Sequence, residues 1–442
     1  MIYEKLKNKD PEIYDLILKE EQRQKEGIEL IPSENYASSA VLEAMASIFN
    51  DKYAEGYPKK RYYGGNFYID ELEELCQKRA REAFGALEYN VNVQPYSGTP
   101  ANLAVYFGLL NFGDTILSLK LSHGGHLSHG DPISLSGKSF NFVHYEVEED
   151  TQKINYEKIK DLAEMHKPKL IISGFTAYPR QVDFQKISEI AHSVSAFSMA
   201  DISHISGLII GGVHPSPFPY CDIVTTTTHK TLRGPRGAMI FSKPELSEKI
   251  NKAVFPGMQG GPHEHIIAGI AVALKEAQTP EFKEYARQII LNAQALSQSL
   301  LNQGINLVSG GTDNHLLLLD LRNFGPGKGY FIEKALEIAN ITVNKNPIPG
   351  DTFPPYYPSG IRLGTPAVTS RGMKENDLNL IGKWIAEVIK KFANYNMPED
   401  KTERQKAISD FLEKIKNDEF LLNLKNEVKN FAEKFPLPGV DI

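Results

Sequence analysis

The sequence predicts an α/β protein with a mostly parallel sheet in a large domain and a smaller C-terminal α/β domain. Short apolar runs alternate with helical patterns from about residue 28 to 275, which is typical of βαβ units. The length of 442 residues exceeds what a single hydrophobic core usually serves. We expect an N-terminal helical arm over residues 1–27, a large domain over 28–280 and a small domain over 281–442.

The first element is a charged helix over residues 1–27, in which charged side chains interrupt the apolar ones every few positions. This pattern lacks the unbroken apolar region of a signal peptide. No later window reaches the 18 apolar residues of a membrane-spanning helix. We therefore expect a cytoplasmic protein without a membrane partner.

Five strands are predicted in the large domain, at residues 114–119, 169–175, 196–202, 222–228 and 237–242. Several are apolar almost throughout, as expected when helices cover both faces of a parallel sheet. Ligands of open α/β sheets bind beyond the carboxyl ends of the strands. Those ends carry Asp201, His204, Thr227, His229 and Lys230.

The C-terminal part begins with a long helix after Pro280 that ends at Gly304, since glycine commonly terminates helices. A strand follows at 315–321. A later amphipathic helix has an apolar face formed by Ile381, Trp384, Ile385, Val388 and Ile389. After Pro398 the chain is charged and helical, and no chemistry is indicated there.

Composition argues against two classes of protein. The net charge of −6 leaves no excess of basic residues to neutralise a phosphate backbone, so we expect no nucleic-acid partner. Cys76 and Cys221 are far apart and outside any CxxC pattern, which argues against a disulfide framework or a thiolate zinc site and favours a reducing compartment.

The stretch TTTTHKTLRGPRG, residues 225–237, sets a lysine at the end of a predicted buried strand. Burial is costly for a lysine unless its charge is paired or its pKa is lowered, and a lowered pKa is what a Schiff-base lysine needs. An exposed surface lysine is the alternative interpretation.

Three neighbouring features favour the Schiff-base lysine. Asp201 could keep a pyridine nitrogen protonated, residues 97–99 before Pro100 could bind a phosphate at a helix start, and the glycine-rich residues 255–262 allow close approach. Each alone could be an ordinary cap or turn. Together they indicate a pyridoxal 5'-phosphate site.

Several long motifs carry a family resemblance: IPSENY (31–36), KYAEGYPKKRYYGG (52–65), LSHGGHLSHG (121–130), TTTTHKTLRGPRG, VFPGMQGGP and SGIRLGTPA (359–367). The chain resembles serine hydroxymethyltransferase over essentially its whole length. The resemblance implies a homodimeric fold-type I pyridoxal-phosphate transferase with shared active sites. Its substrates would be serine and tetrahydrofolate, its products glycine and 5,10-methylenetetrahydrofolate, by a retro-aldol step or by direct displacement.

The resemblance also implies site residues. Those for catalysis are Lys230, Glu55, His126, Asp201, Tyr63 and His229. Those for the cofactor are Lys230, Ser97, Gly98, Thr99, His126, Thr176, Asp201, His204, Thr227, Tyr53, Gly260 and Gly261. Those for the amino acid are Ser33, Tyr63, Arg362 and Glu55, and those for folate are Leu121, Gly125, His126, Leu127 and Asn346.

Each role follows from the matching motif. Lys230 would bind the cofactor as an internal aldimine, Asp201 would pair with the ring nitrogen and His126 would stack on the ring. Arg362 would clamp the substrate carboxylate, and Glu55 would handle the proton of the substrate hydroxyl. Residues 97–99 would hold the phosphate together with glycines 260 and 261 of the neighbouring subunit, while residues 176 and 204 would lie around the phenolic oxygen.

Some alternatives stay open. The tyrosines could be packing residues, and Arg61 and Arg236 could orient the site or form ion pairs. The histidines at 123, 126 and 129 lie in a glycine-containing loop without a recognisable ligand spacing, so we expect no metal.

Rival functions are a threonine aldolase or aminotransferase on the same fold, and a catalytically silent scaffold. The segment around Glu55 and the LSHGGH loop argue against the first, and the intact lysine, aspartate, arginine and glutamate argue against the second.

The sequence departs from the family pattern at two serines. Ser203 and Ser206 stand where the family more often has alanine. Because Asp201 and His204 are retained, we expect altered packing or hydrogen bonding behind the ring with the chemistry kept.

Overall fold

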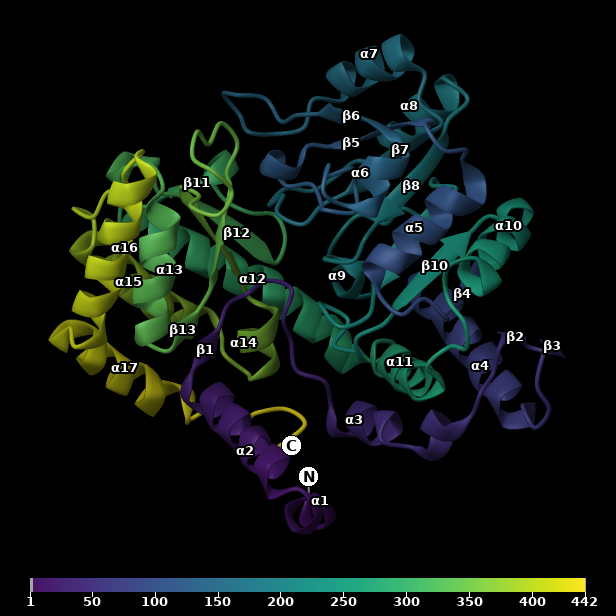
Figure 1. Cartoon of the computed structure of the whole chain (residues 1–442), viewed down its shortest axis with the longest axis horizontal. Coiled ribbons are helices and arrows are strands. Elements are labelled where there is room, and N and C mark those ends of the chain that lie inside the picture. Colours follow the sequence, from purple (N-terminus) through teal and green to yellow (C-terminus); the bar gives the residue numbers. More distant parts are fainter. Residues whose placement is uncertain (1–2, 442) are drawn as a thin grey trace. The chain divides into compact units, whose positions relative to one another are not determined.

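The computed structural model describes residues 3–441 (Figure 1). Within them the chain forms two compact units: Ala40–Arg287 is one, and the residues up to Ser39 together with those from Gln288 onward are the other. The division falls inside helix α12 (Pro280–Asn302). The domain boundaries expected from the sequence stay predictions, because compactness alone does not establish which segments fold as domains.

The unit Ala40–Arg287 is built on a seven-stranded sheet with the strand order β4-β10-β9-β8-β7-β5-β6. The five strands from β9 to β6 in that order run parallel, and β10 is antiparallel to both of its neighbours. The strands are β4 (Asn90–Asn92), β5 (Thr115–Leu119), β6 (Asn141–Tyr145), β7 (Leu170–Gly174), β8 (Phe197–Asp201), β9 (Ile223–Thr227) and β10 (Ala238–Ser242).

All five strands predicted for this region are confirmed, as β5, β7, β8, β9 and β10. Every residue of β7, β9 and β10 is buried, which explains the nearly continuous apolar sequences of β7 and β10. The three threonines that end β9 are buried as well. The α/β class with a mostly parallel sheet is therefore confirmed.

Helix α5 (Gly98–Leu109) lies over the sheet. Except for Asn102, its buried residues between Ala101 and Tyr106 share one hydrophobic core with side chains of β5, β7, β8, β9 and β10 and with α10 (Ser247–Lys252). Helix α8 (Phe184–Ser193) packs along β7 and β8. The other elements of this unit are α3 (Ser39–Met45), η1 (Ile48–Asp51), β2 (Gly56–Tyr57), β3 (Lys60–Arg61), α4 (Phe67–Phe84), η2 (Leu121–His123), α6 (Leu135–Ser139), α7 (Tyr156–His166), α9 (Ser206–Ile210), η3 (Pro244–Leu246), η4 (Ala253–Met258) and α11 (Glu264–Glu276).

The second unit has a four-stranded antiparallel sheet of order β11-β12-β15-β14, formed by β11 (Asn306–Leu307), β12 (Leu316–Asp320), β15 (Gly360–Gly364) and β14 (Asn344–Asn346). The predicted strand at 315–321 is β12. The predicted amphipathic helix is α15 (Glu375–Lys391), whose five predicted apolar residues are all buried. Its other elements are β1 (Ile28–Glu29), η5 (Val308–Gly310), η6 (Arg322–Phe324), α13 (Lys328–Ile338), β13 (Ile341–Thr342), α14 (Pro366–Ser370), α16 (Lys401–Lys416) and α17 (Glu419–Ala432).

The N-terminal segment corrects one expectation. The sequence was expected to form a single charged helix, whereas the structure has two, α1 (Glu4–Lys9) and α2 (Pro11–Glu26). The break lies at Asp10, whose carboxylate accepts the N–H of Ile13 at 3.1 Å. Pro11 at the first helical position cannot donate to a preceding turn, so the pair starts a new helix and ends the old one.

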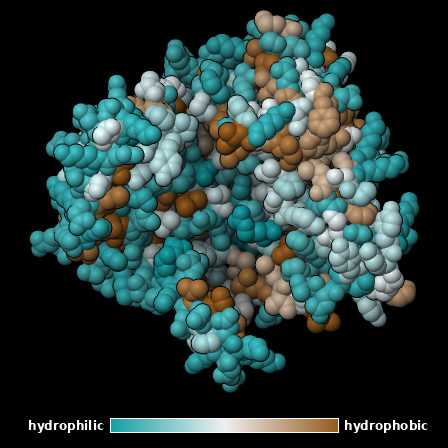
Figure 2. Space-filling view, viewed as in Figure 1, coloured by the Kyte–Doolittle hydropathy of each residue, from teal (hydrophilic) through white to brown (hydrophobic). Residues whose placement is uncertain are grey.

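Hydrophilic residues cover most of the face seen in Figure 2, and hydrophobic groups lie between them. None of the helices in the described residues is both long and apolar enough to cross a membrane.

Candidate active site

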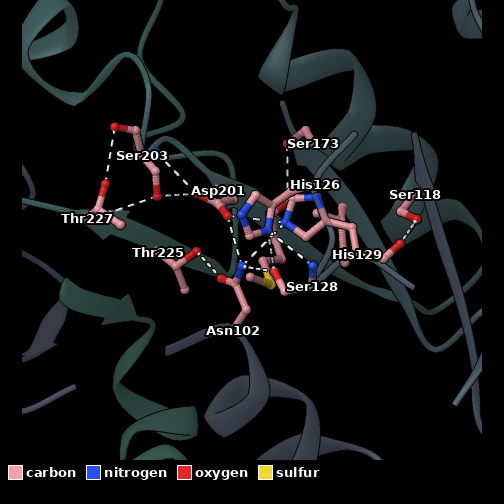
Figure 3. Close-up of polar contacts among 12 residues, drawn as sticks. Asn102, Ser118, His126, Ser128, His129, Ser173, Asp201, Ser203, Thr225 and Thr227 are labelled. Carbon is pink, nitrogen blue, oxygen red and sulfur yellow. Dashed lines mark hydrogen bonds and ion pairs between the residues drawn. The ribbon is translucent and has the colours of Figure 1, made fainter. Parts of the chain in front are cut away.

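Asp201 is the last residue of β8 and lies at the centre of a buried polar network (Figure 3). Its Oδ2 accepts a hydrogen bond from Asn102 Nδ2 at 2.9 Å and lies 3.1 Å from His129 Nε2. Its Oδ1 accepts the hydroxyl of Ser203 at 2.6 Å. Parallel strands bring their carboxyl ends to one edge of the sheet, so residues distant in sequence meet there.

The charge state of Asp201 follows from these contacts. Burial by itself raises the pKa of Asp201, but the hydrogen bond and charge of His129, the charge of His126 and the hydroxyl of Ser203 together hold that pKa well below its usual range. Asp201 is therefore an ionised carboxylate in a buried setting.

The loop after η2 carries two histidines into this network. His126 Nδ1 accepts the N–H of Ser128 at 3.1 Å, so the proton of a neutral ring lies on Nε2. The rings of His126 and His129 have centroids 5.4 Å apart. Asn102 Nδ2 donates to Ser128 Oγ at 2.9 Å and so connects the loop to α5.

A glycine makes room for the contact between Asp201 and His129. Gly174 ends β7, and a Cβ atom there would lie 2.7 Å from Asp201 Cβ and 2.7 Å from His129 Cε1. Carbon atoms do not approach so closely, so any larger residue would push the imidazole or the carboxylate away.

The N-terminus of α5 faces the same end of the sheet. Ser97 is its N-cap residue and makes no capping hydrogen bond from its side chain, and the N–H groups of the first turn have no intrahelical acceptor. A Cβ atom on Gly98 would lie 2.7 Å from Thr227 Cγ2, at the end of β9. Exposed N–H groups, the hydroxyls of Ser97 and Thr99 and the helix dipole together suit an anion such as a phosphate.

Lys230 lies in the turn after β9 and is 8 % exposed. The turn is fixed by a hydrogen bond from Arg233 N–H to Lys230 O at 3.1 Å, and by Thr231 Oγ1, which donates to His204 O at 3.0 Å. Burial, followed by the charges of Lys230 and Arg236, lowers the pKa of His229 to about 3. His229 is therefore neutral beside the lysine.

An anion cradle, a buried carboxylate, an imidazole and a lysine thus lie at the carboxyl ends of strands in one unit. The family model described as serine hydroxymethyltransferase matches residues 6–385 of this chain. The chain belongs to the serine hydroxymethyltransferase family. It is a pyridoxal-phosphate-dependent glycine hydroxymethyltransferase of fold type I whose co-substrate is tetrahydrofolate, and the functional reading of the sequence is confirmed.

This donor set fits pyridoxal phosphate. The helix start suits the phosphate, and a carboxylate held ionised in a buried place suits a protonated ring nitrogen. Gly98 leaves space against Thr227 that a side chain would fill. Among the residues described, no three or more His, Cys, Asp or Glu side chains gather in a way that could hold a metal ion.

A second cluster of this serine hydroxymethyltransferase surrounds Glu55. A Cβ atom on Gly260 would lie 3.2 Å from Glu55 Oε1, and one on Gly261 would lie 3.6 Å from the ring of Tyr53. The rings of Tyr53 and Tyr63 meet edge to face with centroids 5.2 Å apart. The structure thus brings together, within one chain, five residues that the sequence had assigned to substrate and cofactor.

The sequence left open whether Arg61 orients the site or forms ion pairs, and in the structure it does both. Its Nε lies 2.9 Å from Asp70 Oδ1 and its Nη2 lies 2.8 Å from Glu73 Oε1, so it forms two ion pairs. Its Nη1 also donates to the carbonyls of Ala54 and Gly56, at 2.9 and 3.0 Å. These carbonyls flank Glu55, so the backbone on both sides of Glu55 is fixed by one buried guanidinium. Arg236 is exposed and acts on His229 through its charge.

Three predicted site residues belong to the other unit. Arg362 is buried in the middle of β15, where its Nε donates to Asn344 Oδ1 at 3.0 Å. Burial lowers the pKa of Arg362 to about 10, so it stays charged at neutral pH. Asn346 ends the neighbouring strand β14. Ser33 follows Pro32, whose Cα would lie 2.5 Å from a Cβ atom on Gly364, so its segment lies against the end of β15.

The predicted folate residues Leu121, Gly125 and Leu127 lie in η2 or the loop after it, and Thr176, which follows β7, contacts this loop. Gly124 has a φ of +108°, and its carbonyl accepts the N–H of Thr176 at 2.8 Å. A Cβ atom on Gly125 would lie 2.2 Å from Leu119 O, so the backbone of the loop packs directly against the end of β5 at this glycine. Leu127 is 49 % exposed and presents an apolar side chain next to His126.

The sequence did not single out Asn102, His129 as a partner of Asp201, or Gly174. Asn102 and Gly174 are single polar or small residues inside apolar segments. One signal could have marked Asn102: it is a polar residue in the buried, otherwise apolar face of α5, and a buried amide needs hydrogen-bonding partners.

Proposed function

We propose that this serine hydroxymethyltransferase acts through the residues at the carboxyl ends of β7, β8 and β9, with Lys230 as the residue that carries the cofactor. The observation that carries this proposal is the buried, ionised Asp201 with its three hydrogen-bonding partners, Asn102, His129 and Ser203, set beside the N-terminus of α5. A carboxylate so strongly favoured in its charged form is suited to face a protonated pyridine nitrogen.

Each cofactor contact has a separate task. Ser97, Gly98 and Thr99 bind the phosphate, together with glycines 260 and 261 of a neighbouring subunit. Asp201 would keep a proton on the ring nitrogen, His126 would pack against the ring, and Thr176 and His204 would lie around the phenolic oxygen. Bound pyridoxal phosphate supplies a conjugated ring that accepts the electron pair left on the substrate Cα when a bond to that carbon breaks.

The amino acid is held by its carboxylate. Arg362 offers a planar guanidinium that suits two-point binding of a carboxylate, and Ser33 adds a hydroxyl. When the Cα–Cβ bond of serine breaks, Glu55 takes the proton of the β-hydroxyl, and the β-carbon leaves at the oxidation level of formaldehyde for transfer to folate. Tyr53 and Tyr63 flank Glu55. Return of one proton to Cα then leaves glycine on the enzyme, and the steps reverse in the other direction.

We place the pterin of tetrahydrofolate on the loop of Leu121, Gly125, His126 and Leu127, with Asn346 as a further contact. The exposed Leu127 side chain and the backbone beside it support this proposal, because a planar heterocycle binds well to an apolar surface with nearby backbone donors.

The enzyme forms a homodimer in this proposal. Tyr62, Phe67 and Tyr68 are 74 %, 79 % and 75 % exposed and follow Glu55 closely in the sequence. Exposed aromatic side chains in such numbers are typical of an interface. Size-exclusion chromatography with light scattering tests this, and a monomer that keeps its cofactor on dilution would contradict the shared site.

A cytoplasmic location is supported by the two free, buried cysteines Cys76 and Cys221, which fit a reducing compartment. Cell fractionation followed by immunoblotting tests the location.

The decisive experiment measures folate-dependent release of glycine from serine by the purified protein and by Lys230→Ala. We expect turnover by the wild type and none by the variant, while the absorbance of bound pyridoxal phosphate persists because the phosphate and ring contacts remain. Normal turnover by Lys230→Ala would show that another lysine carries the cofactor. Transamination without any folate dependence would favour the aminotransferase alternative.

A further inference from the structure

Ser203 makes an unusual set of contacts two residues beyond the end of β8 (Figure 3). Its hydroxyl donates to Asp201 Oδ1 at 2.6 Å, and its backbone N–H donates to the same oxygen at 3.1 Å. The N–H of Thr227 donates to Ser203 Oγ at 3.0 Å. The hydroxyl therefore connects the carboxyl ends of β8 and β9.

The direction of the hydroxyl proton follows from these partners. Thr227 N–H can only donate and the Asp201 carboxylate can only accept, so the single hydroxyl hydrogen of Ser203 points to Asp201. A separation of 2.6 Å is typical of a hydroxyl bonded to an ionised carboxylate. Ser203 is 6 % exposed, so water does not compete freely for this bond.

Ser203 also lies close to the proposed phosphate cradle. A Cβ atom on Gly98 would lie 3.9 Å from Ser203 Oγ and 2.7 Å from Thr227 Cγ2. The hydroxyl thus sits between Asp201 and the end of β9 that packs against the start of α5.

We propose that Ser203 is a positioning residue for Asp201. Its hydroxyl donates to Oδ1, while Asn102 and His129 contact Oδ2. Together these contacts hold the carboxylate ionised and in one orientation for the ring nitrogen of the cofactor. This inference rests on the proposed role of Asp201. Ser203 does not touch the reacting atoms and acts only through the carboxylate.

Ser206 provides a matched control. It begins α9, three residues after Ser203, and it is 0 % exposed. Its hydroxyl has no hydrogen-bond partner within the described part of the chain. Replacing either serine by alanine removes one buried hydroxyl, but only the change at 203 removes a donor to Asp201.

The experiment titrates the cofactor-free protein with pyridoxal phosphate and with its analogue in which carbon replaces the ring nitrogen, and follows binding by fluorescence. We expect Ser203→Ala to weaken binding of pyridoxal phosphate by about 10-fold, which corresponds to about 1.4 kcal/mol and is the size expected for a hydrogen bond to a charged group. Binding of the carbon analogue should change by less than about 2-fold, because it offers no nitrogen for Asp201 to hold. Ser203→Thr, which keeps a hydroxyl, should bind like the wild type, and Ser206→Ala should change neither affinity.

The selective loss distinguishes positioning of Asp201 from a general packing role. Equal weakening of both ligands by Ser203→Ala, or no weakening of either, would overturn the proposal. Thermal melting of each cofactor-free variant shows whether it is folded. If the alanine variant unfolds, Ser203→Cys takes its place, because a thiol is close to a hydroxyl in size but is only a weak donor, and the same selective loss is expected.

Asp201→Asn separates this inference from the function on which it rests. If this variant loses the preference for pyridoxal phosphate over the analogue while Ser203→Ala keeps it, the role of Asp201 stands and the role of Ser203 is wrong. If Asp201→Asn keeps the preference, the role of Asp201 is refuted and the role of Ser203 with it.

Discussion

Replacing Glu264 by glutamine should stabilise this protein at neutral pH, and increasingly so as the pH rises. Glu264 begins α11, which packs against α4, and it is 1 % exposed. Burial, followed by the negative charge of Glu73 on α4, raises the pKa of Glu264 from 4.5 to about 9. Burial raises the pKa of Glu73 as well, but Arg61 and Gln94 donate hydrogen bonds to its carboxylate. The proton of the pair therefore belongs on Glu264.

The magnitude follows from proton linkage. The folded protein keeps a proton on Glu264 that the unfolded chain releases above pH 4.5, so folding takes up a proton and stability falls as the pH rises from 4.5 towards about 9. At about 1.4 kcal/mol per pH unit, the cost at pH 7 is about 3 kcal/mol relative to acidic solution. Glutamine has the same size and no charge to lose, so Glu264→Gln avoids this cost.

Urea unfolding of wild type and Glu264→Gln at pH 5, 7 and 8.5 tests the argument. The stability gain of the variant should be less than about 1 kcal/mol at pH 5, about 3 kcal/mol at pH 7 and larger still at pH 8.5. Glu71→Gln, on the exposed side of α4, is the control and should change stability by no more than about 0.5 kcal/mol at any pH. A gain that does not grow with pH, or a variant less stable than wild type at pH 7, would refute the assignment of the proton to Glu264.

Three further predictions concern the active site. Glu55→Gln should bind serine nearly normally but lower folate-dependent turnover by about 10²- to 10⁴-fold, because the amide cannot take the hydroxyl proton. Unchanged turnover in a steady-state assay would show that Glu55 does not have that role. Arg362→Ala should weaken serine binding by about 2 to 5 kcal/mol through loss of a buried charged partner, measured by spectroscopic titration, and an unchanged affinity would place the carboxylate clamp elsewhere. Gly174→Ala should lower the free energy of unfolding by about 1 to 3 kcal/mol and weaken cofactor binding, because the added methyl group meets Asp201 and His129. A variant that melts and binds cofactor like the wild type would contradict this, because it would show that the site accommodates the methyl group without cost.

Much of the fold could be predicted from local sequence patterns. The five strands of the large sheet are short apolar runs bounded by polar residues and turns, and each lies within a residue or two of its expected place. The break between α1 and α2 was missed because the charge pattern continues across it, although Asp10 and Pro11 form a recognisable helix start.

The residues of the proposed site likewise divide into those that local sequence marks and those that it does not. Lys230, Asp201 and the residues before α5 could be found because they follow strands or begin a helix, where side chains and N–H groups are free to bind ligands. Ser203, two residues after Asp201, was marked by its departure from the family pattern, and its expected hydrogen bonding is the contact with Asp201. The other neighbours of Asp201 could not be found in this way. Asn102, His129 and Gly174 come from three separate segments, and nothing local to any of them marks their convergence.

The sequence by itself determined the fold class, the family and the identity of the residues proposed to do the chemistry, because these depend on motifs whose residue types and order are written along the chain. The tertiary structure alone decided which of those residues are buried, which are charged and which hold one another in place. Asp201 remains ionised and Glu264 holds a proton for the same physical reason: the charge state of a buried carboxyl group depends on the donors and charges around it, and only folding brings those neighbours together.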